Sequence, residues 1–157
     1  MADSEQDDHT RQGLLERTRE QHDRLEVLLA PLGNDELTRP GVTDGWSVKD
    51  HLAHLTWWAR RVMLVVGGAP DPLEAMPGDD HSEDDINAWL YAANRDRTLA
   101  DVRAGFAGMH GDLLAFIATL PDDTLAQHYV WISGNADWHY GEHARMFEAW
   151  RAGMSGD

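Results

Sequence analysis

The sequence predicts an all-α protein, a four-helix bundle, from three observations. Apolar residues recur every three or four positions along four long segments, which is the periodicity of helices that bury one face. Proline and glycine separate these segments, and no run shows convincing strand alternation with a partner. Four such helices, joined by one short and two longer connections, are typical of a bundle around one core.

The first two helices are expected at residues 4–32 and 47–66. The first has leucines at helical spacing among charged residues and is stopped by Pro31. The second begins at Ser47, which is a good N-cap, and Asp50 completes a pair that resembles a capping box. A stretch rich in proline and glycine ends this helix.

The third helical segment is expected at 82–120 and the last helix at 135–152. The apolar periodicity of the third slips at 95–98, which predicts a kink or a break there. Residues 121–134 are expected to form a loop. Although 129–132 has strand-like composition, it lacks an evident partner strand and is treated as part of that loop.

Length and composition predict one globular domain over residues 1–157. Hydrophobic residues make up 42% of the chain and charged residues 26%, which is enough to bury a core of its own. Cysteine is absent, so disulfides, thiolate metal ligands and a cysteine nucleophile are excluded.

The chain is strongly acidic, with a formal net charge of −15 at pH 7. Such a charge repels phosphate backbones, so nucleic acid is not expected as a partner. No apolar run has the length of a membrane span, and the first residues lack the basic and hydrophobic regions of a signal peptide. We therefore expect a cytoplasmic protein that does not bind membranes.

Histidines at helical spacing are the main candidates for a functional site. His139 and His143 lie one turn apart and share a helical stripe with the apolar Met146, so both should face the bundle interior. His51 and His54 lie in the second helix. Buried imidazoles need polar partners, and a shared metal ion is one such partner. Hydrogen bonds within the core are the alternative.

The segment Gly-Trp-Ser-Val-Lys-Asp-His-Leu-Ala-His-Leu at 45–55 resembles the second-helix signature of the DinB-like superfamily, which includes the mycothiol-dependent maleylpyruvate isomerase domains. The resemblance implies a bundle with up-down-down-up order. Residues 86–89 and 95–106, with 138–143, are most similar to the DfsB/ClbS branch. The best-known activity of that branch is self-protection by hydrolysis of the cyclopropane of a genotoxin.

The resemblance implies that His54, His139 and His143 bind a divalent metal such as Zn, Ni, Mn or Fe. Periodicity alone favours His51 as the third ligand, because it lies roughly 60° from the centre of the apolar stripe, whereas His54 lies roughly 120° away. We follow the resemblance and keep His51 as the alternative. Three histidines leave positions open for water or substrate, as in catalytic zinc sites.

Two carboxylates near these histidines are candidates for supporting roles. Asp50 lies one turn before His54 and is expected either to orient that imidazole or to stabilise the first turn of its helix. Glu142 is a candidate general base, and the alternative is a solvated side chain.

The sequence also offers candidates for a substrate pocket. Seven tryptophans are many for this length, and several of them are expected to form apolar walls beside the metal, although a core or dimer-interface role is the alternative for each. Asn87 and Tyr91 share a helix face and are expected to supply polar contacts, with ordinary surface or interhelical hydrogen bonding as the alternative. The tryptophans considered for the walls are Trp57, Trp58, Trp89, Trp131 and Trp138.

These observations lead to one principal functional hypothesis and two alternatives. The principal hypothesis is a metal-dependent hydrolase that acts on a small electrophilic, toxin-like molecule in detoxification or self-resistance. The first alternative is an S-transferase that uses an external thiol such as mycothiol or bacillithiol. The second is a non-catalytic immunity protein that sequesters a toxin. Relatives in the superfamily are often dimeric, so a homodimer is a further expectation.

Overall fold

The computed structural model describes residues 9–155, and within that range the protein is helical and contains no β-strand. The predicted all-α class is therefore confirmed. None of the helices in this range has the length and hydrophobicity needed to cross a bilayer. The elements are α1 (Arg11–Leu29), α2 (Asn34–Thr38), α3 (Val48–Val66), η1 (Pro72–Ala75), α4 (Glu83–Asn94), α5 (Leu99–Thr119), α6 (Asp122–Gly134) and α7 (Asp137–Met154).

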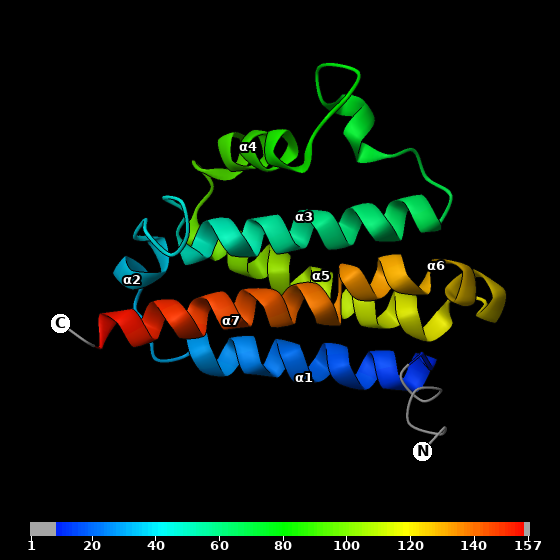
Figure 1. Ribbon diagram of the computed structural model, residues 1–157, viewed down its shortest axis with the longest axis horizontal. Coiled ribbons are helices and arrows are strands. Elements are labelled where there is room, and N and C mark those ends of the chain that lie inside the picture. The colour runs from blue at the N-terminus through cyan, green and yellow to red at the C-terminus, as the bar shows by residue number, and fades with distance from the viewer. Residues whose placement is uncertain (1–8, 156–157) are drawn as a thin grey trace.

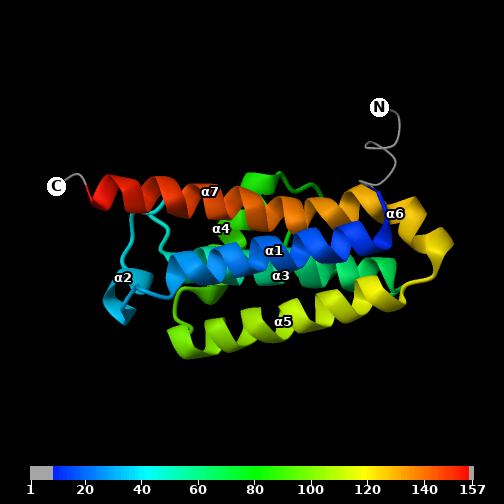
Figure 2. The same cartoon turned by 90° about the horizontal axis from the view of Figure 1, so that it is seen from below.

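Four long helical segments lie side by side: α1, α3, α5 and the pair α6 and α7 (Figure 1, Figure 2). α3 packs along α5, and α1 packs along α7. Followed by their colours in Figure 1, α3 and α5 run opposite to α1, and α7 runs in the direction of α1. This is the up-down-down-up order that the resemblance implied. Side chains from all these segments form one core.

The fourth bundle segment differs from its prediction because 121–134 is mostly helix rather than loop. Pro121 precedes the first turn of α6, which has two aspartates near the helix N-terminus, where the dipole favours negative charge. Leu125, Tyr129 and Ile132 are buried at helical spacing. The strand-like composition of 129–132 is thus overridden by an amphipathic pattern that buries this segment against the core.

A break at Asn135 and Ala136 separates α6 from α7, and an ion pair fixes its geometry. Asp137 is buried and accepts hydrogen bonds from Ser133 Oγ at 2.7 Å and from Arg17 Nε at 2.9 Å. Arg17 Nη2 also donates to the Tyr129 hydroxyl at 2.6 Å. Arg17 of α1 therefore binds both α6, through Tyr129, and α7, through Asp137, which lies two residues before His139.

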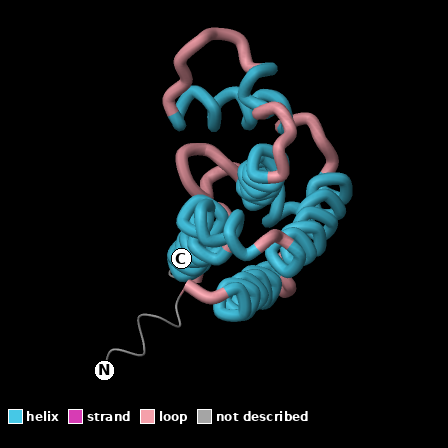
Figure 3. The backbone as a smooth tube through the Cα atoms, turned by 90° about the vertical axis from the view of Figure 1, so that its right-hand side faces the viewer, coloured by secondary structure: helices cyan, strands magenta, loops and turns pink. Residues whose placement is uncertain are grey.

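The third predicted helix is two separate helices, with the break at 95–98 where the periodicity slipped. α4 ends at Asn94, and α5 begins after Thr98, whose hydroxyl accepts a hydrogen bond from the Asp101 backbone N–H. α4 does not continue the bundle helix but packs on the outer side of α3 (Figure 3). Its buried Ile86 and Leu90 are not part of the core cluster of the bundle.

The other predicted boundaries are close to those observed. α3 begins at Val48 after Ser47, and the predicted capping box with Asp50 is present. α1 begins at Arg11 and ends at Leu29, inside the expected range of 4–32, of which residues 4–8 lie outside the described part. α7 spans Asp137–Met154, two residues later at each end than expected.

A pair of half-buried histidines packs between α1 and α5. The rings of His22 and His110 stack 3.6 Å apart between centroids, and Nδ1 of His110 is hydrogen-bonded to the Tyr140 hydroxyl at 3.2 Å. Burial lowers the pKa of both histidines, that of His110 to about 4, although Glu26 and Asp23 favour the charged form of His22. The lowered pKa values favour neutral rings in this stack at neutral pH.

We expect Ser47→Ala to lower the free energy of unfolding by about 1 kcal/mol, because it removes the cap of α3. Denaturant unfolding in the presence of a chelator measures the change. Ser155→Ala, which removes a hydroxyl at the exposed end of α7, is the control. An equal loss in both variants would contradict a stabilising role for the capping box.

We expect stability to fall as the pH is lowered from 6.5 towards 4, partly because of the histidine stack. An unfolded histidine binds a proton near pH 6.5, whereas folded His110 binds it only near pH 4, so the unfolded state takes up more protons within that window. His110→Phe keeps a flat ring and should make the decline shallower. His128→Phe is the control, and an unchanged slope in His110→Phe would exclude the stack as a contributor.

Candidate metal centre

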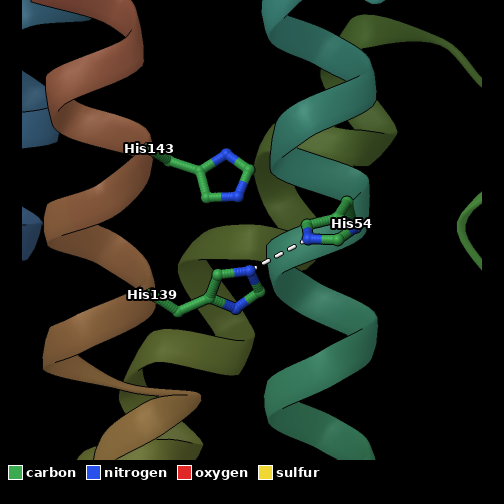
Figure 4. Close-up of side chains that lie close together, drawn as sticks. All are labelled: His54, His139 and His143. Carbon is green, nitrogen blue, oxygen red and sulfur yellow. Dashed lines mark hydrogen bonds between the residues drawn. The ribbon is translucent and has the colours of Figure 1, made fainter. Parts of the chain in front are cut away.

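Three histidines from two bundle helices converge where α3 faces α7 (Figure 4). His54 comes from α3, and His139 and His143 come from successive turns of α7. Each offers one ring nitrogen, and these atoms all lie within 4.8 Å of one another. The structure thus brings together the three residues that the resemblance identified as metal ligands.

The rings already contact one another in this arrangement. Nε2 of His54 lies 2.9 Å from Nε2 of His139. The ring of His143 is 5.1 Å from that of His54 and 4.8 Å from that of His139, between centroids. Nε2 of His143 is on the side of its ring that faces the other two histidines (Figure 4).

Burial keeps these imidazoles in the neutral form that binds metals. It is the largest cause that lowers the pKa of His54 to about 3 and that of His139 to about 4. The pKa of His143 is lowered well below its usual value by burial, and then by the charge that neighbouring histidines would carry. At neutral pH each ring therefore has a nitrogen lone pair.

His51 joins the cluster from α3 and is 3% exposed. Its Nδ1 lies 3.0 Å from Nδ1 of His143, and its Nε2 lies 2.8 Å from the Thr43 hydroxyl. Burial lowers the pKa of His51 to about 4, although the nearby charge of Asp50 opposes this. Both nitrogens of His51 thus have protein partners, and this distinguishes it from the three convergent residues.

The four histidines line one end of a cavity of about 550 Å³ between the bundle and α4. Asn87 and Tyr91 of α4 and Glu142 of α7 also line it, so the structure brings these three predicted residues to the cavity. The remaining lining residues are Thr43, Asp44, Gly45, Trp46, Glu83, Asp84, Ala88 and Met146.

Asp50 does not contact the predicted ligand His54. Its Oδ2 accepts hydrogen bonds from the Ser47 backbone N–H and the Ser47 hydroxyl, both at 2.8 Å. The geometry therefore supports its capping alternative and corrects the expectation that it orients His54. The carboxylate still acts on the cluster through its charge, which favours the protonated form of His51.

None of the expected tryptophan walls is among the residues that line the cavity. Trp138 is 70% exposed, because it points away from the histidine face of α7. Trp57 packs edge-on against Trp58 and Trp89, with ring centroids 5.1 and 6.1 Å away. Trp58 donates its Nε1–H to Asn87 Oδ1 at 3.2 Å. The three tryptophans at this contact therefore attach α4 to α3.

Trp131 forms a cation–π contact instead of a cavity wall. The guanidinium carbon of Arg61 lies 5.6 Å from the centre of the Trp131 ring and 5.5 Å from that of Trp58.

Thr43 and Trp46 belong to the site, although the sequence analysis did not assign them to it. The Trp46 backbone N–H donates to the Thr43 carbonyl at 2.7 Å, across a turn in which Asp44 and Gly45 have φ of 48° and 83°. Both central residues are left-handed, as in a type I′ turn, for which Asp-Gly is a favoured sequence. That dipeptide was the signal that could have placed Thr43 beside the second helix.

The donor set fits a divalent ion. Tetrahedral zinc with nitrogen ligands at 2.0–2.1 Å separates those nitrogens by about 3.3 Å, so the His54–His139 contact must open slightly and His143 must approach. The buried Nδ1 atoms of His54 and His139 have no hydrogen-bond partner in the described part of the chain. The two rings are hydrogen-bonded to each other through Nε2, and the nearby Asn87 favours the charged form of His54.

The fold and the cavity together define a helical-bundle protein with a candidate three-histidine metal centre. Residues 15–149 match the family model of the DinB superfamily, and the chain belongs to that superfamily.

The fold also resembles that of an uncharacterised protein from Escherichia coli UTI89, solved by crystallography. The TM-score is 0.75 at 16% sequence identity, and the match covers 94% of this chain and 95% of that one. This likeness supports the fold alone. The comparison with curated proteins found no match.

We expect the protein to bind one equivalent of zinc and the His139→Ala/His143→Ala double variant to bind none. Zinc at a hundred times its dissociation constant should stabilise the wild-type protein by about 2.7 kcal/mol, because it binds only the folded state. Elemental analysis and thermal unfolding of protein without a histidine tag measure both effects. His128→Ala is the control, and equal zinc content in the double variant would refute the assignment.

Proposed function

We propose that this protein is a metal-dependent hydrolase of the DfsB/ClbS type that acts on a small electrophilic molecule in detoxification or self-resistance. The supporting observation is the convergence of three neutral imidazoles, two buried and one partly buried, at the wall of a cavity large enough for a small molecule. Exposed residues such as Glu83 and Asp84 also line this cavity, so a solute can reach the histidines from solvent.

A divalent ion held by His54, His139 and His143 would supply Lewis acidity and lower the pKa of a water molecule. Residues of the cavity wall would accept the proton and orient the substrate. Glu142 lies on α7, between the two proposed ligands of that helix, and lines the cavity. We assign its carboxylate to accept a proton from the attacking water.

Asn87 and Tyr91 would orient the substrate from the opposite wall. The hydrogen bond from Trp58 Nε1–H fixes which way the Asn87 amide points. The Tyr91 ring stacks on Trp46, with centroids 5.8 Å apart. A substrate between α4 and the histidines would thus meet oriented polar groups on both sides.

The charge of the lining favours some reactants over others. Asp44, Glu83, Asp84 and Glu142 line the cavity, and no Lys or Arg is among its lining residues. A cationic electrophile is therefore attracted and a neutral one is not repelled, whereas a thiol that carries carboxylates is repelled. This supports hydrolysis over transfer to an anionic thiol such as bacillithiol.

We expect zinc-loaded protein to add one water to an activated cyclopropane or epoxide without any added thiol. Glu142→Gln should lower the turnover number about 10²- to 10⁴-fold, because it removes the proton acceptor. Mass spectrometry identifies the product, and initial rates give the turnover number. Glu148→Gln, on the same helix but paired with Arg24 outside the cavity, is the control.

Two outcomes would replace this proposal. Turnover that requires mycothiol or bacillithiol, with the thiol found in the product, would identify an S-transferase with the same ligands. Stoichiometric protection against a toxin that survives His139→Ala/His143→Ala would identify a sequestering protein.

A further inference from the structure

The fourth histidine of the cluster is the feature that the proposed function leaves without a role. His51 touches His143 through Nδ1 and Thr43 through Nε2, at 3.0 and 2.8 Å. Of the three rings assigned to the ion, His143 has its Nδ1 on His51, whereas Nδ1 of His54 and of His139 has no hydrogen-bond partner in the described part of the chain. His51 is thus hydrogen-bonded to His143, one of the three proposed metal ligands, and neither of its own ring nitrogens is free to bind the ion.

A hydrogen bond between two neutral imidazoles requires one donor and one acceptor. If Nδ1 of His143 donates, its Nε2 keeps a lone pair on the side facing His54 and His139 (Figure 4). If instead His51 donates, Nε2 of His143 carries the proton and cannot bind a cation. Only the first arrangement is compatible with the metal centre.

The first arrangement also determines the proton on His51. Its Nδ1 accepts from His143, so the proton of the neutral ring is on Nε2, where it is donated to the Thr43 oxygen at 2.8 Å. The type I′ turn at Asp44 and Gly45 places that oxygen. The direction of every hydrogen bond from Thr43 to His143 is therefore set.

The ring of His51 is also fixed in position. Trp46 lies 5.3 Å away and Phe147 lies 5.5 Å away, between centroids, on elements that precede and face α3. With 3% of the residue exposed, His51 borders the cavity with little of its surface, and its Nδ1 is the partner observed at Nδ1 of His143.

We propose that His51 is a positioning residue, which accepts the Nδ1 proton of His143 and, through its own hydrogen bond to Thr43, holds His143 in the tautomer that presents Nε2 to the ion. This rests on the proposed metal site. Metal-binding histidines usually donate their second N–H to a carboxylate, a carbonyl or water, and here a neutral imidazole takes that place.

The experiment measures zinc affinity by competition with a chromophoric chelator. His51→Leu should weaken binding about 10- to 100-fold, the range found when such partners are removed. His51→Asn should recover most of the loss, since its side-chain oxygen lies near the place of Nδ1 and accepts a hydrogen bond. Thr43→Val should cause a smaller loss, because it removes only the outer contact.

Two matched controls separate this effect from general damage to the fold. Thr56→Val makes the same change on α3, at a hydroxyl that bonds to the Leu52 carbonyl, and should leave affinity unchanged. His110→Leu removes a half-buried histidine outside the cluster and should do the same. Circular dichroism checks each variant, and if His51→Leu does not fold, Thr43→Val and His51→Asn carry the test.

Nitrogen-15 spectra of histidine-labelled, zinc-loaded protein give a second readout that a merely structural residue would not affect. Nδ1 of His143 and Nε2 of His51 should carry the protons. Zinc bound directly to His51, or a proton on Nδ1 of His51, would overturn the proposal, as would unchanged affinity in His51→Leu. Failure of the wild-type protein to bind zinc would instead refute the metal site itself.

Discussion

Neutral imidazoles that share protons at the largely buried wall of a cavity are the constraint on which this site depends. Burial lowers the pKa of His51, His54, His139 and His143, so each ring has one proton and one lone pair at neutral pH. The close contacts among them are then possible only with matched donors and acceptors, or with a cation in place of a proton. The packing of α3 against α7 brings these four rings together, so they must either pair donors with acceptors or share a cation.

Most of the fold could be predicted from apolar periodicity and capping signals. The N-cap at Ser47 and the break at 95–98 were both visible in the sequence. The helix after Pro121 was not, because β-branched and aromatic residues with a following glycine suggest extended or loop structure. The helical spacing of Leu125, Tyr129 and Ile132 was a weaker signal than this composition, and burial of these residues against the core decided the segment.

The site could be predicted only in part from the sequence, because the packing of α3 against α7 also determines which side chains meet. The spacing of His139 and His143 places them on one face of a helix, but the choice between His51 and His54 depends on which way α3 turns towards α7. Periodicity favoured His51, which is indeed more buried at 3% exposure than His54 at 7%. The more central ring makes hydrogen bonds inside the protein, whereas the ring nearer the cavity joins the convergent set.

Because α4 lies outside the bundle, its residues that line the cavity are different from the residues that hold the four-helix core together. Asn87 and Tyr91 face the cavity from a helix whose own apolar contacts, Ile86 and Leu90, are not part of the core. Substitutions along α4 can therefore reshape the chamber while the four-helix framework and its histidines stay intact. Divergence within the superfamily can act on this outer helix, so that one inherited scaffold can present cavities of different shape and polarity beside the same histidines.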